Sequence, residues 1–373
     1  VIVNNLENPD PTPIDGPLEI ISNNNPDAPG NSFSSIVLNE NLRTVTDFAV
    51  LGSEMGVTYR INDGADKDLF WINPETGVLS FKEAPDWENP QDAEGDNNYE
   101  VNVLAERNGQ FDAQFLTVTV ANVDDANAPD PVSVYLIGGQ SNAVGEALLS
   151  NLPAPYINPF PRAKIWGAPS ESFVTLAPGF DGQTTNVGPE FSFGRTIVDR
   201  TNQDVYLVKY GLGATSLDVD WNPSGAGGGK GRQFNTFVDT VNQALDTLTT
   251  NGITYELDGL VWQQGESDTY DDGFADRYQD NLTNFIGTVR DFYGADLEVS
   301  IGLIRNDLPT SDDNRKDVRD AQIFVSGADP KVNLVDTDML GPASTVLIDG
   351  DPTHYSAAGQ VALGNAYGNS FAI

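Results

Sequence analysis

The chain contains a single histidine, and the residues around it make it a candidate for acid/base chemistry. His354 closes the run Asp351-Pro-Thr-His, so a carboxylate precedes it by three positions. Such a carboxylate accepts one ring N–H, fixes the tautomer and leaves the other nitrogen free to take a proton. Imidazole chemistry near neutral pH therefore depends on His354 alone. The alternative is a lone histidine in a surface loop.

A candidate nucleophile lies far upstream, directly after a predicted strand. Residues 132–137 form a short, β-rich apolar run, which leads into Gly138-Gly-Gln-Ser141-Asn142. The glycines allow a tight turn. A helix that opens at Ser141 would put its hydroxyl where free N–H groups favour negative charge. Taken alone, the segment fits equally well a serine that only caps a helix.

Two further predicted strands end in turns of the same kind. Residues 204–210 lead into the Gly-rich turn 211–216, and residues 257–262 lead into Gln263-Gln-Gly-Glu266. Ligands gather at the carboxyl ends of strands in open parallel sheets. A glycine N–H and a side-chain amide are both suitable donors to an oxyanion. Together these turns predict an acyl-transfer site.

The four segments resemble the signature blocks of the SGNH hydrolase superfamily, in its sialate O-acetylesterase/acetylxylan esterase-like branch. The matches are G-Q-S-N at 139–142, the Gly-rich turn with Thr-Ser at 213–216, W-x-Q-G-E-x-D at 262–268 and D-x-x-H at 351–354. Order and spacing agree as well as residue types, from about residue 130 to the end. An ordinary α/β-hydrolase fits less well, because its nucleophile sits in a G-x-S-x-G elbow and position 143 here is Ala.

The resemblance assigns roles to individual residues. It implies Ser141 as nucleophile, His354 as general base and Asp351 as its orienting carboxylate, with no cofactor for catalysis. The oxyanion hole would consist of the Ser141 N–H, the Gly213 N–H and the Gln264 side-chain amide. Many relatives carry a second glycine where this chain has Ala214, which matters if that position needs a positive φ. We expect the neighbouring acids Glu266 and Asp268 to orient loops.

Composition excludes several classes of chemistry and of partner. The chain has no cysteine and one histidine, so disulfides, cysteine nucleophiles and histidine-cluster zinc sites are ruled out. Asp and Glu number 55 against 19 Lys and Arg, a formal net charge of −36. Such a surface repels nucleic acid and anionic membranes. No stretch approaches the roughly 20 apolar residues of a membrane span.

The N-terminal third has a different pattern. Residues 1–30 are rich in Asn and Pro, which predicts an extended lead-in. Residues 31–127 show short alternating runs separated by turn residues, as in an all-β sandwich. The runs are 57–61, 69–72, 99–104 and 114–120.

This region resembles a bacterial cadherin-like repeat, through the motifs at residues 39–41, 70–77, 86–90 and 123–125. The resemblance implies a structural calcium ion held by hard oxygen ligands. Its ligands would be Glu40, Asp86, Glu88, Asp124 and Asp125. There are departures: residues 49–53 lack the expected A-x-D-x-D acids, and Arg107 stands where an acid is usual. The alternative is a spacer without calcium.

After a hinge at 124–130 the hydrophobic period changes. Residues 234–248 and 274–289 show helical spacing and alternate with the predicted strands. Residues 128–373 therefore predict an α/β fold, a three-layer α/β/α sandwich with a parallel, flavodoxin-like sheet. Trp262, Trp221 and Tyr210 would lie near its mouth, either stacking on sugar rings or belonging to the core.

The sequence thus predicts a two-domain serine esterase that removes O-acetyl groups from carbohydrate, with a neutral glycan favoured because the acidic surface opposes an anionic substrate. The chain starts at Val1 without Met or a signal-peptide pattern, which predicts the mature or trimmed product of a secreted or cell-surface protein. Two alternatives stay open. One is a calcium-dependent adhesion or carbohydrate-binding protein with a silent hydrolase domain, and the other is a lipase or thioesterase of the same superfamily.

Overall fold

The computed structural model describes residues 18–22, 33–50, 56–123, 130–178, 180, 185–224 and 231–373. The chain divides into two compact units, which are described separately. The first contains Val45–Leu79, Pro90–Val120 and the residues before Asn39. The second contains Asn39–Thr44, Ser80–Asn89 and Ala121–Ile373. Most of the predicted lead-in and hinge lies outside the described residues.

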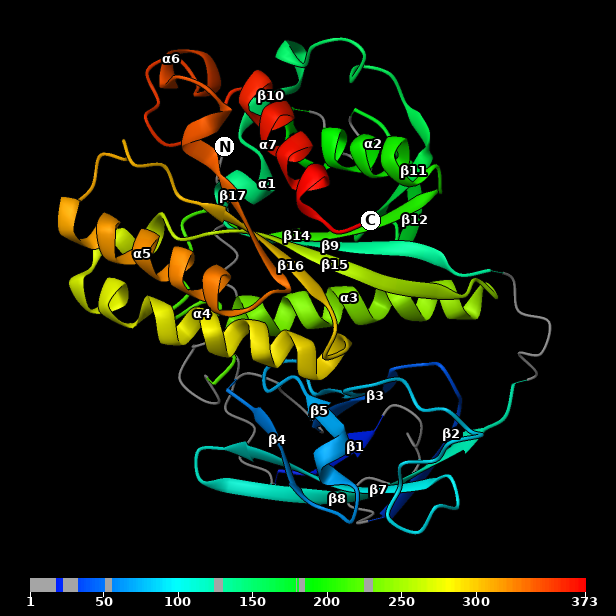
Figure 1. Ribbon diagram of the computed structural model, residues 1–373. Helices are drawn as coiled ribbons and strands as arrows, with labels where there is room; N and C mark the ends of the chain where they lie inside the picture. Colours follow the sequence, from blue (N-terminus) through cyan, green and yellow to red (C-terminus); the bar gives the residue numbers. More distant parts are fainter. Residues whose placement is uncertain are drawn as a thin grey trace, which may run out of the picture. The chain divides into compact units, whose positions relative to one another are not determined.

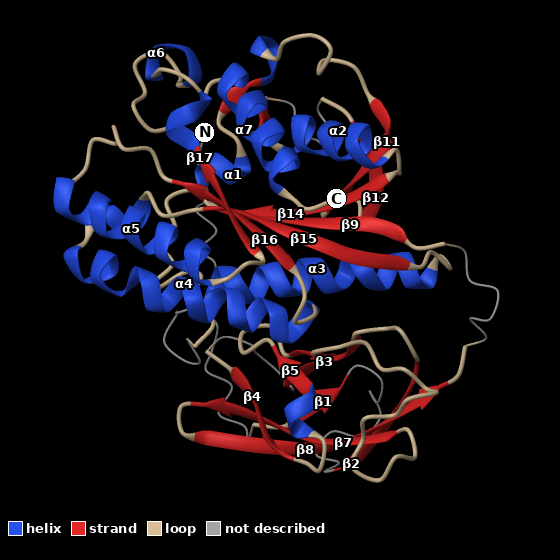
Figure 2. Cartoon of the chain, viewed as in Figure 1, coloured by secondary structure: helices blue, strands red, loops and turns tan. Residues whose placement is uncertain are grey.

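The N-terminal part is all-β, as predicted (Figure 2). Two four-stranded sheets have the orders β1-β3-β6-β5 and β2-β8-β7-β4. In β8 the buried residues alternate with half-buried ones from Gln114 to Val120, as expected of a strand with one face on a core. The strands are β1 (Ile20–Ser22), β2 (Phe33–Asn39), β3 (Thr44–Val50), β4 (Thr58–Asp63), β5 (Phe70–Ile72), β6 (Val78–Phe81), β7 (Asn98–Arg107) and β8 (Gln110–Ala121), with a 3-10 helix η1 (Lys67–Leu69).

The second unit is built on a seven-stranded sheet of order β12-β11-β14-β9-β15-β16-β17. All neighbouring strands are parallel except the antiparallel edge pair β11 and β12. The strands are β9 (Val132–Gly139), β11 (Phe160–Gly167), β12 (Ser172–Leu176), β14 (Val205–Gly211), β15 (Tyr255–Gln263), β16 (Glu298–Leu303) and β17 (Val332–Asp336), and a separate pair is formed by β10 (Ala147–Leu148) and β13 (Asn186–Val187).

Helices cover both faces of this sheet (Figure 1). α3, α4 and α5 lie on one face, and α1, α2 and α7 lie on the other. The predicted three-layer α/β/α arrangement with a mostly parallel sheet is therefore confirmed. The helices are α1 (Ser141–Val144), α2 (Glu190–Thr201), α3 (Arg232–Thr250), α4 (Asp272–Tyr293), α5 (Asp312–Ala328), α6 (Ala343–Val346) and α7 (Ala357–Ser370), with the 3-10 helices η2 (Leu149–Asn151), η4 (Ser267–Tyr270) and η5 (Thr337–Leu340).

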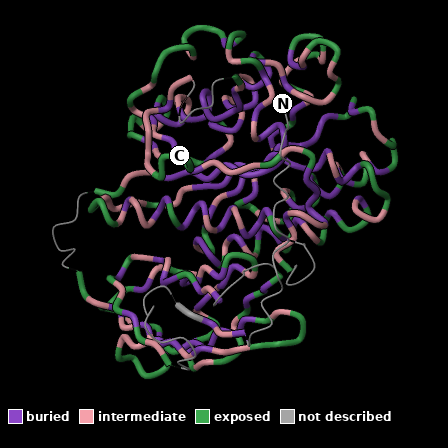
Figure 3. Tube along the Cα trace, turned by 180° about the vertical axis from the view of Figure 1, so that it is seen from behind, coloured by how far each residue is buried: buried purple, intermediate pink, exposed green. Residues whose placement is uncertain are grey.

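The hydrophobic pattern explains why these elements form. β9 is buried without interruption from Val134 to Gly139, as expected of a central strand covered on both faces. Figure 3 shows the central sheet of this unit as buried over most of its length. α3 buries Phe234, Val238, Val241 and Leu245, which lie on one helical face. The parallel strands β9, β14 and β15 all end at one edge of the sheet, where the predicted motifs begin.

Candidate active site

Ser141 is placed by the turn at the end of β9. Gly139, the last residue of that strand, has φ +138°, and a Cβ there would lie 2.0 Å from the carbonyl oxygen of Gln263. Only glycine fits such a close approach between two strand ends. Ser141 then opens α1, which has four residues. A helix this short has little macrodipole, so any stabilisation of negative charge comes from its free N–H groups.

The structure brings the three residues predicted as the triad into one hydrogen-bonded chain. The Nε2 atom of His354 lies 3.0 Å from Oγ of Ser141. The Nδ1 atom of the same ring lies 2.7 Å from Oδ2 of Asp351. With Nδ1–H donated to the carboxylate, Nε2 is the acceptor that faces the serine hydroxyl.

Asp351 is held by further hydrogen bonds. Its Oδ1 accepts the backbone N–H groups of Thr353, at 2.8 Å, and of His354, at 3.1 Å. Burial alone would raise the pKa of Asp351, but the hydrogen bonds from the imidazole and from these amides lower it below its usual value. The carboxylate is therefore ionised across the neutral range, as an orienting partner of His354 requires.

Gly213 lies against the nucleophile. A Cβ built on it would be 3.5 Å from Cβ of Ser141, so the backbone of this turn borders the serine. The next residue, Ala214, has φ +59°. The departure from the family pattern thus falls on a position in the left-handed region, which a side chain penalises.

The hydrogen bonds of the Gln264 amide go to groups other than Ser141. Its Nε2 lies 2.6 Å from Oδ2 of Asp268, 3.1 Å from the carbonyl oxygen of Thr215 and 3.3 Å from Oε1 of Gln140. Its Oε1 accepts the Tyr278 hydroxyl at 3.1 Å. An amide nitrogen has two hydrogens, so three acceptors leave none unused for an oxyanion. Gln264 as a donor in the oxyanion hole stays a prediction.

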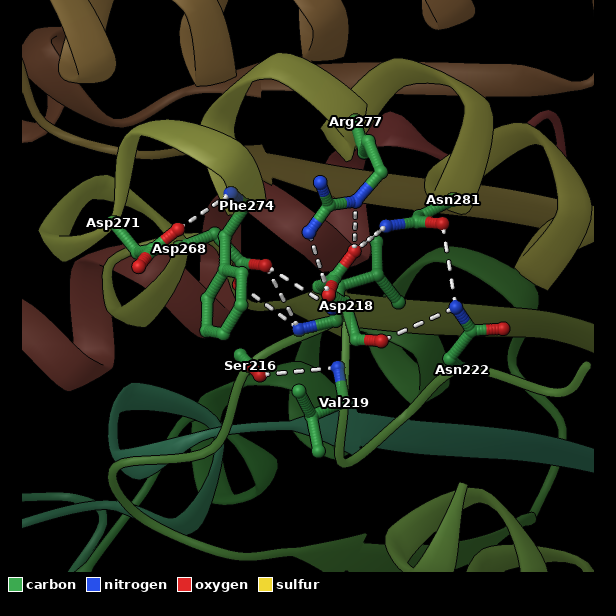
Figure 4. A network of polar contacts seen from close by, with 10 residues as sticks. Ser216, Asp218, Val219, Asn222, Asp268, Asp271, Phe274, Arg277 and Asn281 are labelled. Atoms are coloured by element: carbon green, nitrogen blue, oxygen red, sulfur yellow. Dashed lines mark hydrogen bonds and ion pairs between the residues drawn. The ribbon is translucent and has the colours of Figure 1, made fainter. Parts of the chain in front are cut away.

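Asp268 accepts hydrogen bonds from the residues that directly follow the Gly213–Ser216 turn (Figure 4). Its carboxylate accepts the N–H groups of Leu217, at 2.9 Å, and Asp218, at 3.2 Å, besides the Gln264 amide. Burial raises the pKa of Asp268 to about 7, although these donors act to lower it. The expected role of Asp268 in orienting a loop agrees with this geometry.

Asp218 extends the same network to α4. Arg277 donates to it through Nε at 2.7 Å and Nη2 at 3.0 Å, and Asn281 donates at 3.0 Å (Figure 4). Sequence reasoning missed all three residues, because none belongs to a motif and they meet only when α4 packs beside the turn.

For Trp262 and Trp221 the structure supports the second of the two predicted alternatives, a place in the core rather than contact with a sugar. Trp262 and Trp221 are fully buried and meet edge to face, with ring centroids 5.0 Å apart. Trp262 also packs on Phe285 of α4, with centroids 4.1 Å apart. Side chains alternate between the faces of a strand, and Trp262 points into the helix layer. Both tryptophans belong to the core.

Tyr210 instead lines a cavity of about 190 Å³ at the ends of β11 and β14. The cavity borders the nucleophile helix through Val144, and its other lining residues are Trp166, Ala168, Pro169, Phe180, Lys209 and Gly211. The sequence analysis did not predict these lining residues, because it did not predict the strand that carries Trp166. The only signal was the aromatic composition of residues 160–173.

The cation in this cavity is already paired. Lys209 donates to Oε2 of Glu190 at 2.6 Å and to the carbonyl oxygen of Val144 at 2.7 Å. The Lys209 side chain is 7% exposed and that of Glu190 is fully buried. The Nε1 atom of Trp166 is buried and has no hydrogen-bond partner among the described residues. Among its described lining residues, the cavity therefore combines apolar walls with little net charge.

Three of the predicted calcium ligands lie together. One carboxylate oxygen each from Glu40, Asp86 and Glu88 lies within 4.8 Å of the others. Glu40 also accepts the backbone N–H groups of Trp87, at 2.8 Å, and Val123, at 2.6 Å. Carboxylate oxygens suit calcium, which takes six to eight oxygens, so this trio fits as part of a shell. Asp124 and Asp125 lie outside the described residues.

Comparison with known families gives one match. Residues 131–372 match the family described as carbohydrate esterase, sialic acid-specific acetylesterase. No curated protein sequence matches the chain. In the described part of the chain, no helix is both long and apolar enough to cross a membrane.

Solved structures are similar to the chain at low sequence identity. A protein from Arabidopsis thaliana has a TM-score of 0.53 at 20% identity, over 64% of this chain and 97% of that one. A carbohydrate acetylesterase from Xanthomonas citri has a TM-score of 0.41 at 14% identity, over 88% and 70%. Human protocadherin-24 has a TM-score of 0.21 at 19% identity, over 28% and 48%. The first of these supports the α/β/α fold of the C-terminal unit.

Proposed function

The chain belongs to the carbohydrate esterase family of sialic acid-specific acetylesterases, and on that premise we propose that it is a serine esterase that removes O-acetyl groups from a neutral glycan. The observation that carries the mechanism is the chain of hydrogen bonds from Ser141 through His354 to Asp351. Members of this family are carboxylic ester hydrolases, and the chemistry proposed needs no cofactor.

The reaction follows from this geometry. His354 takes the hydroxyl proton at Nε2 while Ser141 Oγ attacks the acetyl carbonyl carbon. The negative charge that develops on the carbonyl oxygen is stabilised by the backbone N–H groups of Ser141 and Gly213. As the bond to the sugar oxygen breaks, His354 returns the proton to that oxygen. Water then attacks the acetyl-serine by the same route and releases acetate.

The preference for a neutral sugar rests on the cavity beside α1. Tyr210, which is half-buried, offers aromatic surface for a sugar ring, and aromatic side chains commonly serve as such walls in ligand pockets. The cation there, Lys209, is compensated by Glu190. A carboxylated sugar such as sialic acid would therefore find no unpaired positive charge among the described residues that line this cavity, and it would also meet the strongly acidic surface.

Acetate release from a panel of acetylated xylan, acetylated glucomannan and O-acetylated sialic acid tests the proposal. We expect release from the neutral glycans and none from any substrate with Ser141→Ala. Release from sialic acid alone would overturn the neutral-glycan preference. Hydrolysis of long-chain acyl esters without release from any glycan would favour a lipase.

One variant tests the cavity. Tyr210→Leu removes the half-buried aromatic ring that lines the cavity and keeps an apolar side chain. It should raise KM for an acetylated oligosaccharide several-fold and leave p-nitrophenyl acetate, which has no sugar, unchanged. Equal effects on the two substrates would show that Tyr210 acts through the fold.

The proposal extends to the localisation of the enzyme and to a structural metal ion. A polymeric glycan cannot cross the cell membrane to reach an enzyme, which supports action outside the cell; fractionation of producing cells tests this. The carboxylate trio Glu40, Asp86 and Glu88 supports a structural calcium ion.

A further inference from the structure

The side chain of Asn142 joins the nucleophile turn to the loop that carries the base. Asn142 directly follows Ser141 and is 1% exposed. Its Nδ2 donates to the carbonyl oxygen of Thr353 at 3.1 Å, and its Oδ1 accepts the N–H of Tyr355 at 3.2 Å. Thr353 and Tyr355 are the two neighbours of His354. One side-chain amide therefore holds the backbone on both sides of the base.

The His354 loop is held mainly by contacts within the C-terminal segment. The residues between Asp351 and Tyr355 form bends rather than helix or strand. The Asp351 carboxylate accepts the N–H groups of Thr353 and His354, the Ile348 N–H donates to the carbonyl oxygen of His354 at 2.9 Å, and Tyr355 forms a β-bridge with Leu347. The side chains of His354 and Asp351 are 28% and 34% exposed. None of these contacts reaches the nucleophile turn, so the Asn142 side chain joins the backbone of the loop to that turn.

Glu266 fixes the orientation of the Asn142 side chain. Its Oε1 accepts the second N–H of the Asn142 amide at 2.7 Å, and the Gln263 amide at 3.3 Å. Both hydrogens and the oxygen of the Asn142 amide are thereby used, which leaves that amide one orientation. The other carboxylate oxygen, Oε2, is buried and has no hydrogen-bond partner among the described residues.

A buried carboxylate oxygen without a partner is energetically unfavourable and calls for an explanation. Burial raises the pKa of Glu266, and the hydrogen bonds from Asn142 and Gln263 and the charge of His354 act in the opposite direction. A glutamine at position 266 would avoid burying a charge, but its Nε2 would take the place of Oε2 and be equally without a partner. A carboxylate oxygen also accepts an amide N–H more strongly than a neutral oxygen does.

We propose that Asn142 and Glu266 are positioning residues for His354: Glu266 fixes the Asn142 amide, and Asn142 keeps the base in hydrogen-bonding contact with Ser141. The inference rests on the proposed esterase function for its kinetic consequence only. A displacement of about 1 Å in a catalytic group lowers turnover by about 10²-fold.

The kinetic test uses Asn142→Ala on p-nitrophenyl acetate. We expect kcat to fall 10- to 100-fold with KM nearly unchanged, because a small ester is bound without the loop. The control is Asn314→Ala, which removes another buried asparagine that donates to Thr269 and Asp272 through the same atom. It should lower thermal stability by a similar amount and leave kcat unchanged. Equal kcat losses in the two variants would overturn the proposal.

Glu266 offers a second test that preserves the packing. Glu266→Gln keeps an oxygen to accept the Asn142 N–H, so it should retain kcat within about threefold. Glu266→Ala removes the acceptor and should lower kcat about 10-fold. A Glu266→Gln variant as impaired as Glu266→Ala would overturn the positioning role in favour of a direct effect of charge.

The single histidine permits a readout without any substrate. The chain's only imidazole gives one set of ring signals in the NMR spectrum, and the Nδ1 proton bound to Asp351 should appear far downfield. Asn142→Ala should shift or broaden these signals, and Asn314→Ala should leave them in place. Unchanged signals in Asn142→Ala would overturn the inference. If the signals move but the wild-type protein hydrolyses no ester, the proposed function fails and the positioning role stands.

Discussion

At the scale of single residues, His354 gives the sharpest test, because no second imidazole exists to replace it. Ser141→Ala and His354→Ala should each lower kcat on p-nitrophenyl acetate by several orders of magnitude, since nucleophile and base act as a unit. The double variant should be little worse than either single one. Near-native turnover by His354→Ala would show that the base has been misassigned.

Gln264 has two possible roles that predict different measurements. As the structure places it, Gln264→Ala removes one hydrogen bond each from Asp268, the Thr215 carbonyl and the Tyr278 hydroxyl in a buried site. We expect the free energy of unfolding to drop by about 2–3 kcal/mol, with a loss of kcat that follows the loosened turn. Chemical denaturation and steady-state kinetics on the same samples check this.

The opposite pattern of effects on kcat and stability would support the Gln264 amide as a donor to the oxyanion. A loss of about 10²- to 10³-fold in kcat with unchanged stability is the signature of a donor that acts only in the transition state. Gln263→Ala is the neighbouring comparison. Its amide is also buried, but it bonds to Glu266 and accepts the Tyr367 hydroxyl instead.

At the scale of elements, the Gly213–Ser216 turn carries a local strain at Ala214, whose φ is +59°. In this region of φ, a residue with a side chain is less stable than glycine by about 1–2 kcal/mol. Glycine is also freer in the unfolded chain, which offsets part of the stability gained by replacing alanine with it. Ala214→Gly should therefore stabilise the protein by up to about 1 kcal/mol and leave kcat close to the wild-type value.

A helical alanine is the control for that substitution. Ala362 lies within α7, where glycine is unfavourable by about 1 kcal/mol. Ala362→Gly should lower the melting temperature and Ala214→Gly should raise it. If both lower it, the turn at Ala214 is not strained in solution.

At the scale of the whole molecule, the formal charge of −36 shapes any experiment with cations. We expect millimolar calcium to raise the melting temperature of the full chain through the Glu40, Asp86 and Glu88 trio. Salt alone also stabilises a highly charged protein by screening repulsion, so the comparison must be made at matched ionic strength.

Two variants separate binding from screening. Glu88→Gln removes one ligand and should abolish the specific effect of calcium. Glu94→Gln removes an exposed acid outside the trio and should retain it. A melting temperature that responds equally to calcium and to matched sodium chloride would leave the N-terminal part as a spacer without calcium.

The sequence by itself determined the candidate triad and the class of fold that carries it. Ser141, Asp351 and His354 stand in motifs whose spacing is local, and continuous apolar runs such as residues 132–137 predict buried parallel strands. Hydrophobic periodicity is likewise local, which is why α3 and α4 could be predicted within a few residues of their ends.

Only the tertiary structure decided which polar and aromatic side chains face the site. Trp262 and Gln264 lie two positions apart at the end of β15, yet one is core and the side chain of the other bonds to residues of four segments. Asn142 meets Thr353 across 211 positions of sequence. The direction of a side chain at a strand end and the identity of its distant neighbours depend on packing, and no local pattern in the chain encodes them.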